Sequence, residues 1–496
     1  MTENRKNSIE IDKVEFQKIG YQLIDRIADL FDSIHTKQVT TTKTPSELQK
    51  ILGDHSLPEN GTSPLELVSK TTDLLFENSL FNGHPKFLGY ITSSPAPLGV
   101  LADLLAASVN SNVGAQILSP IATEIEKQTI RWLAEFIGVS PTYGGILVSG
   151  GNMANFTAFL AARTAKTSRK IKEDGMDNSV EKFTIYCSKT THTWVEKAAI
   201  LFGLGSNSIR WIKTTSSNKI DEKILEETIK KDLLNGFQPL MIIGTAGDVS
   251  TGVVDNLKNL SIISKYYNMW FHIDGAYGIS AAVIPSLKRL FEGIAEADSI
   301  ELDPHKWLYS PLEAGCTLVK NPQHLIDTFS SHPEYYNFSS TDGETSLNYY
   351  EFGLQNSRGF RALKVWLTLQ QVGRSGYEKL ITEDIELAQF LFQLAGKHEE
   401  LEAITHNLSI TTLRFIPKNP GKSLDSNYLN KLNELILNQL QNGGEIFLSN
   451  AIVHDTYCLR ACVVNFRTSK KDMEEIVEII VREGRKADLK LSDTND

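Results

Sequence analysis

A lysine in an unusual setting is the first residue with evident chemical potential. Lys306 lies in the segment Asp303–Pro304–His305–Lys306–Trp307, directly after the short run 297–302. Most lysines are solvated surface charges, whereas the charge of an amine beside apolar and aromatic groups is expected to be disfavoured. Because a neutral amine attacks aldehydes, the setting indicates a lysine that forms a Schiff base with an aldehyde cofactor.

An aspartate follows the apolar run 269–273, which we expect to be a strand. Asp274 opens the segment Asp274–Gly275–Ala276–Tyr277–Gly278. A carboxylate at the C-terminal end of a parallel strand lies where α/β proteins bind ligands, and it could keep a pyridine nitrogen protonated. Ala276 is small enough for a flat ring to lie above it. For this motif alone, an aspartate that caps a turn or helix is an equally good interpretation.

Two weaker motifs each follow a predicted strand. Gly150 and Gly151 stand between the apolar run 145–148 and a predicted helix, where backbone N–H groups and a helix N-terminus could receive a phosphate. His192 lies in Thr190–Thr191–His192–Thr193–Trp194, after the predicted strand 183–186. A glycine pair before a helix often binds nothing, and a lone histidine is more often structural than catalytic.

The elements around these motifs predict an α/β fold. From about residue 96, short apolar runs alternate with helical patterns, which is typical of a largely parallel sheet with crossover helices. The expected strands are 145–148, 183–186, 240–243 and 269–273, and the expected helices are 153–163, 194–202 and 257–267.

The flanking segments predict two further units. An amphipathic helix over 14–34 and a short helix opened by Thr44–Pro45–Ser46 indicate a helical arm over residues 1–95. The large α/β domain is expected to cover 96–375, and a small C-terminal α+β domain 376–496. In the last part we expect a helix-rich stretch over 359–397, strands at 408–415, 445–448 and 457–464, helices at 428–441 and 472–484, and a frayed tail over 486–496.

Composition and charge narrow the possible functions. The chain has 496 residues, with 60 acidic and 50 basic side chains and a formal net charge of -10, and it shows no basic stripe for nucleic acid. Of the four cysteines, Cys187, Cys316, Cys458 and Cys462, only the last two are close in sequence. No second pair of Cys or His residues accompanies them, so no metal site is expected. Buried thiols, a polar N-terminus and no apolar stretch of about 18 residues predict a cytoplasmic protein without a membrane span.

Taken together, the motifs have the order of a known family. The chain resembles the group II decarboxylases that depend on pyridoxal 5'-phosphate, the family of aromatic-L-amino-acid, glutamate and histidine decarboxylases. The resemblance implies fold type I of the pyridoxal-phosphate enzymes and the decarboxylation of an amino acid, with a weak preference for an aromatic substrate. The matching segments are HPKFLGY at 84–90, SGGNMAN at 149–155, THTWVEKAA at 191–199, TAGDVSTGVVD at 245–255, HIDGAYG at 272–278, DPHKWL at 303–308 and SRGFRALKVW at 357–366.

The resemblance also implies a role for each matching residue. It implies that Lys306 forms the Schiff base with the cofactor and that Asp274 pairs with the pyridine nitrogen. It also implies that His192 packs on one face of the ring and Ala276 on the other. Tyr335, in His332–Pro333–Glu334–Tyr335, matches the loop tyrosine that protonates the substrate carbon after CO2 leaves. The other implied contacts are Gly150, Gly151, Asn152 and His305 to the phosphate, Thr245 to the cofactor, and Tyr90 and Arg358 to the substrate.

Departures from the family pattern and three alternatives remain. Asp248 and Val249 replace two threonines that many members carry, which removes a hydroxyl expected near the cofactor. One alternative is an aldehyde synthase, although relatives of that kind replace the loop tyrosine or the stacking histidine, and both are present here. Another is a carbon–carbon lyase for phosphorylated long-chain amino alcohols, and the third is a non-catalytic protein that binds the cofactor.

The N-terminal arm suggests a second subunit. The apolar stripe of the helix over 14–34 has too little chain nearby to bury it, and exchange of arms between two identical subunits would cover it. Relatives with this arm are dimeric. We therefore expect a homodimer with an amino acid as its small-molecule partner.

Overall fold

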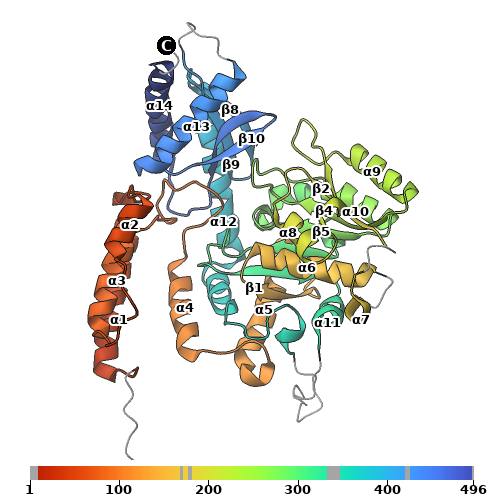
Figure 1. Ribbon diagram of the computed structural model, residues 1–496, viewed down its shortest axis with the longest axis horizontal. Helices are drawn as coiled ribbons and strands as arrows, with labels where there is room; N and C mark the ends of the chain where they lie inside the picture. Colours follow the sequence, from red (N-terminus) through yellow and green to blue (C-terminus); the bar gives the residue numbers. More distant parts are fainter. Residues whose placement is uncertain (1–8, 168–170, 177–180, 332–346, 419–424, 494–496) are drawn as a thin grey trace, which may run out of the picture.

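Two β-sheets and an N-terminal group of helices make up the fold (Figure 1). The computed structural model describes residues 9–167, 171–176, 181–331, 347–418 and 425–493. The sequence prediction of a mostly parallel α/β fold is confirmed. Within the described ranges, no helix is both long enough and apolar enough to cross a bilayer.

The large sheet has seven strands in the order β1-β7-β6-β5-β4-β2-β3. Its neighbours from β6 to β3 pair in parallel, and β7 is antiparallel to both β6 and β1. Helices cover both faces, which explains why most of its strands are continuous apolar runs. The strands are β1 Gly144–Val148, β2 Phe183–Ser188, β3 Ile209–Ile212, β4 Gln238–Thr245, β5 Trp270–Asp274, β6 Ser299–Leu302 and β7 Gly315–Val319.

Alternation along β5 separates the polar face of this sheet from its apolar face. The His272 ring contacts Asn155 of α6, whereas Phe271 points to the opposite face, near Leu260 of α10. Since alternate residues share a face, Asp274 lies on the α6 side with His272. The helices that accompany the sheet are α4 Pro97–Val109, α5 Pro120–Ile137, α6 Gly151–Lys166, α7 Ile171–Asp174, α8 Trp194–Leu201, α9 Glu222–Leu234, α10 Leu257–Tyr266 and α11 Gln323–Phe329.

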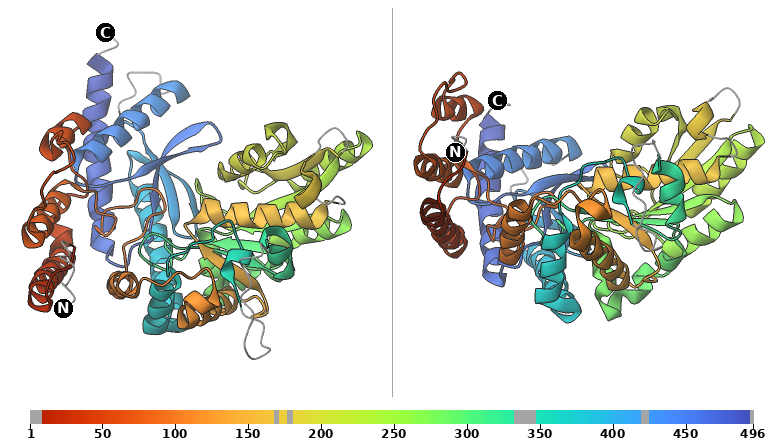
Figure 2. Two further views of the ribbon diagram at one scale, coloured as in Figure 1. Left: turned by 60° about the horizontal axis from the view of Figure 1, so that its bottom comes forward. Right: turned by 90° about the horizontal axis from the view of Figure 1, so that it is seen from below.

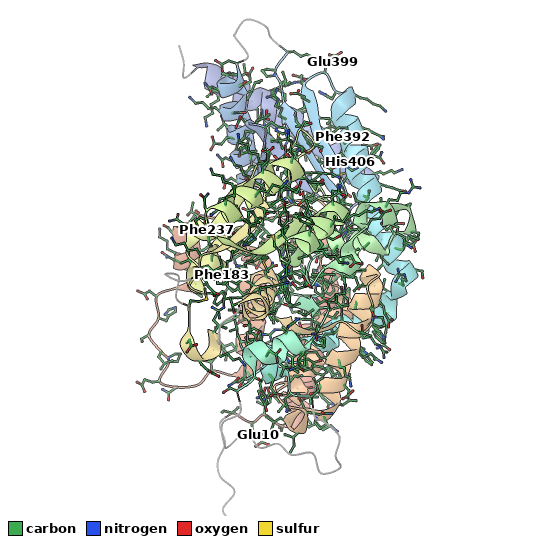
Figure 3. All side chains as sticks on the ribbon, turned by 90° about the vertical axis from the view of Figure 1, so that its right-hand side faces the viewer. Glu10, Phe183, Phe237, Phe392, Glu399 and His406 are labelled. Atoms are coloured by element: carbon green, nitrogen blue, oxygen red, sulfur yellow. The ribbon has the colours of Figure 1, made fainter. Side chains whose placement is uncertain are left out.

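The small C-terminal sheet is antiparallel, in the order β10-β11-β9-β8. The long helix α12 Ala362–Lys397 leads into it and kinks at Gly373, where φ is 66°. Near its end, Phe392 packs against His406 of β8, with 5.9 Å between the ring centroids (Figure 3). We propose that the boundary between the large and small domains lies at this kink. The other elements are β8 Leu401–Asn407, β9 Ile410–Phe415, α13 Ser426–Gly443, β10 Ser449–Val453, β11 Thr456–Cys462 and α14 Lys470–Asp493.

The N-terminal helices lie to one side of both sheets (Figures 1 and 2). Helix α1, Lys13–Ser33, packs along α3, Pro64–Asn78, and Arg26 forms an ion pair with Asp73 across them. The short helix α2, Pro45–Leu52, begins with a capping box between Thr44 and Glu47, in which each residue accepts a hydrogen bond from the other's backbone N–H.

Two predictions for the C-terminal region are wrong. The strand predicted at 445–448 begins instead at Ser449, because the backbone of Phe447 pairs with Lys86 and Leu88 of the N-terminal segment. The tail predicted to fray from residue 486 continues α14 to Asp493. Ala487 there is fully buried, and Asp488 accepts a 2.5 Å hydrogen bond from Tyr428. These contacts anchor the charged tail against α13.

Candidate active site

A cavity of about 850 Å³ opens where the parallel strands end. Strand β4 ends at Thr245, β5 ends at Asp274, and the segment after β6 carries Lys306. This edge is where open α/β sheets bind ligands. Most of the site residues predicted from sequence line the cavity, namely Tyr90, Gly150, Gly151, Asn152, His192, Thr245, Asp274, Ala276, His305 and Lys306.

The electrostatic environment of Lys306 differs from the sequence expectation. Its Nζ lies 2.9 Å from Oδ2 of Asp303, and Glu301 and Asp274 add negative charge nearby. Burial lowers the pKa of Lys306, but the three carboxyl groups outweigh burial, so its pKa is raised overall. The expectation that the charge of this amine is disfavoured is therefore wrong for the protein without a bound cofactor, because acidic groups accompany the apolar ones.

Asp274 is fixed in place by a tryptophan. The indole Nε1 of Trp194, on α8, donates a 2.7 Å hydrogen bond to Oδ2 of Asp274. Behind Asp274, Nε2 of His272 is 2.6 Å from the amide oxygen of Asn155, and its Nδ1 is 2.8 Å from the hydroxyl of Ser299. Burial lowers the pKa of His272 to about 4, so its imidazole is neutral behind Asp274.

The turn between β1 and α6 brings backbone close to the lysine segment. Gly150 has φ of 132°, a conformation that favours glycine, and it precedes the first residue of α6. A Cβ on Gly151 would lie 2.7 Å from Oδ2 of Asp303. The imidazole of His305 packs beside Gly150, with Nδ1 2.6 Å from the carbonyl of Ala314. The N-terminus of α6 thus faces the cavity with no side chain in the way.

His192 reaches the same cavity from the segment after β2. Its Nδ1 accepts a 3.3 Å hydrogen bond from the backbone N–H of Trp194, which leaves the ring proton on Nε2. Burial lowers the pKa of His192, and the positive charge of Lys306 lowers it further, although Asp274 opposes this. The ring is therefore a neutral, flat surface beside the lysine.

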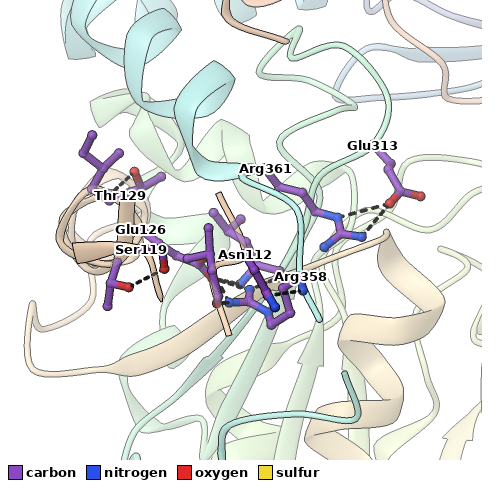
Figure 4. Close-up of polar contacts among 11 residues, drawn as sticks. Asn112, Ser119, Glu126, Thr129, Glu313, Arg358 and Arg361 are labelled. Carbon is purple, nitrogen blue, oxygen red and sulfur yellow. Dashed lines mark hydrogen bonds and ion pairs between the residues drawn. The ribbon is translucent and has the colours of Figure 1, made fainter. Parts of the chain in front are cut away.

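Arg358 does not line the cavity, which contradicts its predicted contact with substrate. Its guanidinium is buried and pairs with Glu126, with Nη2 2.5 Å from Oε1, and it donates to the carbonyls of Val113 and Leu147 (Figure 4). Because these partners use the ends of the guanidinium, Arg358 holds α5 against β1 instead. Tyr335, the predicted proton donor, lies outside the described residues.

The departure at Asp248 and Val249 has a structural explanation. Asp248 accepts hydrogen bonds from the backbone of Ser250, Thr251 and Val253, so it closes its own turn. Val249 lines the cavity in its place. In the part of the chain that is described, the buried hydroxyl of Thr245 has no hydrogen-bond partner, so a polar group remains available on that wall.

Sequence reasoning missed three groups near the cavity. Trp194 was quoted within a motif but given no role, although its indole holds Asp274. Glu301 is fully buried on β6, and a charged residue within a buried strand was the available signal. Arg460 is buried and donates from Nη1 to the carbonyl of Tyr90 and the hydroxyl of Ser449, while its Nε and Nη2 have no partner within the described ranges.

Comparisons with known proteins agree on one family. The model of the pyridoxal-dependent decarboxylase conserved domain matches residues 45–418. An aromatic-L-amino-acid decarboxylase from Bacillus atrophaeus is 34% identical over 478 residues, covering 96% of each chain. A phenylacetaldehyde synthase from Petunia hybrida is 29% identical, covering 92% of each chain. The structure of Catharanthus roseus tryptophan decarboxylase in complex with L-tryptophan superposes with a TM-score of 0.86 at 25% identity, covering 96% of this chain and 99% of the other.

Proposed function

The chain belongs to the pyridoxal-dependent decarboxylase family, and from that premise we propose that its cavity removes the α-carboxylate of an aromatic L-amino acid as CO2 and releases the amine. The enzyme is a carboxy-lyase with pyridoxal phosphate as its cofactor. One observation carries the proposal for this site: Lys306, Asp274, His192 and the glycine turn at the start of α6 line a single cavity.

The residues present fit the cofactor at each of its functional groups. Lys306 offers an amine to an aldehyde, and Asp274 offers a carboxylate to a ring nitrogen. The turn at Gly150 and Gly151 leaves room for a phosphate at the N-terminus of α6, where backbone N–H groups and the helix dipole favour an anion. The hydroxyl of Thr245, which lacks a hydrogen-bond partner in the described structure, adds a polar contact on the wall of the cavity.

Each residue has a defined task in this proposal. When bound, pyridoxal phosphate supplies an aldehyde that condenses with amines and a ring that accepts the electron pair left by departing CO2. Asp274 holds a proton on the ring nitrogen, and Trp194 keeps the carboxylate aimed at it. His192 presents a neutral ring to one face of the site, and Ala276 leaves the other face open. Lys306 would hold the cofactor through its amine.

Arg460 is a buried cation behind the wall of the cavity. Its Nη1 donates to the carbonyl of Tyr90, which lines the cavity, and Nε and Nη2 find no acceptor among the residues described. Arg460 does not itself line the cavity, so we propose that it positions Tyr90 and does not touch the substrate. Arg460→Lys should then raise KM more than it lowers kcat, because a single ammonium cannot reproduce the planar fork that holds this segment.

After CO2 leaves, a proton must reach the substrate carbon. We propose Tyr335 as its donor, on the basis of the family resemblance. If this proton were not delivered, reaction of the substrate carbon with O2 and water would give an aldehyde, ammonia and hydrogen peroxide in place of the amine. The petunia relative carries the name of such an activity, so the two products must be measured together.

The test is a product assay with purified holoenzyme and a panel of amino acids that includes phenylalanine, tyrosine, tryptophan and their hydroxylated relatives. Amine and CO2 should appear in equal amounts, without aldehyde or hydrogen peroxide. Lys306→Ala should abolish both the bound-cofactor absorbance and turnover, a loss of several orders of magnitude. Aldehyde as the main product of the wild type would favour the synthase alternative, and cofactor binding without any product would favour a non-catalytic role.

We also propose that the enzyme is a homodimer. Apolar side chains project from the outer faces of α1 and α4, among them Phe16 at 63%, Tyr21 at 66% and Leu104 at 57% exposure. Burial of such faces in an isologous contact would remove them from water. Light scattering should give twice the 55.3 kDa chain mass at micromolar protein, and a stable monomer would refute the proposal.

The four buried free cysteines fit the reducing cytoplasm that we propose as its location.

A further inference from the structure

Two carboxyl groups lie beneath Lys306, those of Glu301 and Asp303, and only Asp303 has the lysine amine beside it. Glu301 is fully buried at 0% exposure, and neither of its oxygens has an N–H or O–H partner within the described part of the chain. Its Oε1 lies near Oδ2 of Asp303, which is also buried, because a Cβ built on Gly151 would be 3.2 Å from the first oxygen and 2.7 Å from the second. Two ionised carboxylates this close repel each other in a buried site, which favours a proton on one of the pair.

The surroundings decide which group is protonated. Asp303 has Lys306 Nζ 2.9 Å from its Oδ2, whereas Glu301 lies deeper, on β6, paired with Asp274 of β5 and Thr317 of β7. Burial, with Asp303 and Asp274 close by, raises the pKa of Glu301 well above its usual range. The other titratable groups around the pair are His272 on β5, Cys316 on β7, His305 beside Lys306 and His192 across the cavity.

We propose that Glu301 is a neutral acid that hydrogen-bonds Asp303, and that Asp303 is the base that takes a proton from the Lys306 ammonium when this amine reacts. In this step an N–H bond of Lys306 breaks, an O–H bond forms on Asp303, and the nitrogen keeps its electron pair. Asp303 touches the reacting atom, and Glu301 is a positioning residue that acts through it. The inference rests on the proposed function, because it assumes that Lys306 attacks the cofactor aldehyde.

The charge count supports this assignment. If all three carboxyls were ionised, Glu301, Asp303 and Asp274 would place three negative charges around one ammonium in a buried site. One proton on Glu301 leaves Asp303 to neutralise Lys306 and Asp274 to face the cofactor ring. Transfer of the second proton then converts an ion pair into two neutral groups, which a site of low dielectric constant favours.

The first test follows the reaction of cofactor-free protein with pyridoxal phosphate by absorbance, across a range of pH. In the wild type the rate at Lys306 should be nearly independent of pH, because the base is built in. In Asp303→Asn the ammonium must lose its proton to solvent, so the rate should rise about tenfold per pH unit until the amine is deprotonated. Asp298→Asn is the matched control, since this partly buried carboxyl precedes β6 and accepts from the N–H of Phe271, at the end of the strand away from Lys306.

The second test identifies the proton on Glu301 by infrared spectroscopy. The difference spectrum of wild type minus Glu301→Gln should show the carbonyl stretch of a protonated acid, at a pH well above the pKa of about 7 of Asp384 and the pKa of about 6 of Asp255, two further buried acids. The glutamine variant keeps a donor to Asp303, so its reaction with pyridoxal phosphate should stay within about threefold of wild type. Glu301→Leu removes that donor, so the rate of its reaction with pyridoxal phosphate should depend on pH, unlike that of the wild type.

The outcomes distinguish the proposed function from the proposed roles of Asp303 and Glu301. If the wild type forms no adduct at Lys306, the proposed function fails at this site. If it forms the adduct and Asp303→Asn shows the same flat pH profile, the base assignment is overturned while the proposed function stands. Absence of the carboxylic-acid band from the wild type overturns the neutral Glu301.

Discussion

Asp384 gives a quantitative test of how burial acts on a carboxyl group in this fold. It lies in the second half of α12, fully buried, and accepts hydrogen bonds from Trp307 Nε1 at 2.8 Å and Tyr309 OH at 2.5 Å. These donors follow Lys306 directly in sequence, so Asp384 ties α12 to the lysine segment. Burial raises its pKa from 3.8 to about 7, although both hydrogen bonds oppose the rise.

The sign of the effect on stability follows from proton binding. Between pH 3.8 and about 7 the folded state holds a proton on Asp384 that the unfolded state has released. The stabilisation from this proton is complete below pH 3.8 and is lost as the pH rises through about 7. The shift of about three pKa units corresponds to roughly 4 kcal/mol over the whole range.

The perturbation is Asp384→Asn, which keeps an oxygen acceptor for Trp307 and Tyr309 but cannot ionise. Relative to wild type, the variant should gain roughly 1.4 kcal/mol in free energy of unfolding between about pH 6 and about pH 8, a window that spans the folded pKa. Urea unfolding followed by tryptophan fluorescence at several pH values measures this difference. Asp384→Leu, which removes the acceptor as well, should destabilise the protein at every pH.

The reasoning would be refuted by a difference between wild type and Asp384→Asn that does not change with pH. Such a result would mean that Asp384 ionises in the folded protein as easily as in the unfolded chain. The reasoning would also be contradicted if the free energy of unfolding of Asp384→Asn fell relative to wild type as the pH rises. The pH dependence would then have the opposite sign to the one predicted.

The remaining predictions concern the site and its supports. Asp274→Asn should keep the fold and some cofactor yet lose at least about tenfold in kcat, since a neutral partner does not hold a proton on the ring nitrogen; a smaller loss in steady-state assays would contradict its role. Arg358→Met should lower the free energy of unfolding by roughly 3–5 kcal/mol, because Glu126 would remain as a buried unpaired charge, and adding Glu126→Gln should recover part of that loss in urea titrations. Tyr335→Phe should slow amine formation far more than substrate binding and produce aldehyde with hydrogen peroxide; unchanged amine formation would show that the proton comes from another group.

The sequence was sufficient for the parts of the fold that depend on local pattern. Strands β2, β4 and β5 have apolar runs because helices cover both faces of the sheet, and a parallel sheet follows from that pattern. Strand β1 has the same pattern but pairs antiparallel with β7, which the pattern does not indicate. Strand β3, Ile209–Ile212, was not predicted, since it is an edge strand with Trp211 partly exposed and no continuous apolar run.

Contacts between distant segments set the limit of prediction. The start of β10 depends on Phe447 pairing with residues 86–88, and no local pattern reports that pairing. The position of the Arg358 side chain, away from the cavity, depends on its ion pair with Glu126, which lies 232 residues earlier in the chain. The charge of Lys306 likewise depends on Asp274 and Glu301, which neighbouring strands bring together only after folding.

Buried charges in this chain fall into two groups, and the difference separates support from chemistry. Asp232 accepts hydrogen bonds from Tyr186 and Arg210, and buried Arg358 pairs with Glu126 and leaves only its Nε without a partner in the described structure. Such charges are compensated, so their removal should cost stability first. Glu301 and Arg460 retain polar atoms without a hydrogen-bond partner in the described structure, close to the cavity. Burial of a polar group without a hydrogen-bond partner costs free energy. Because the fold bears this cost at Glu301, we expect this carboxyl to take up a proton, which supplies the missing partner.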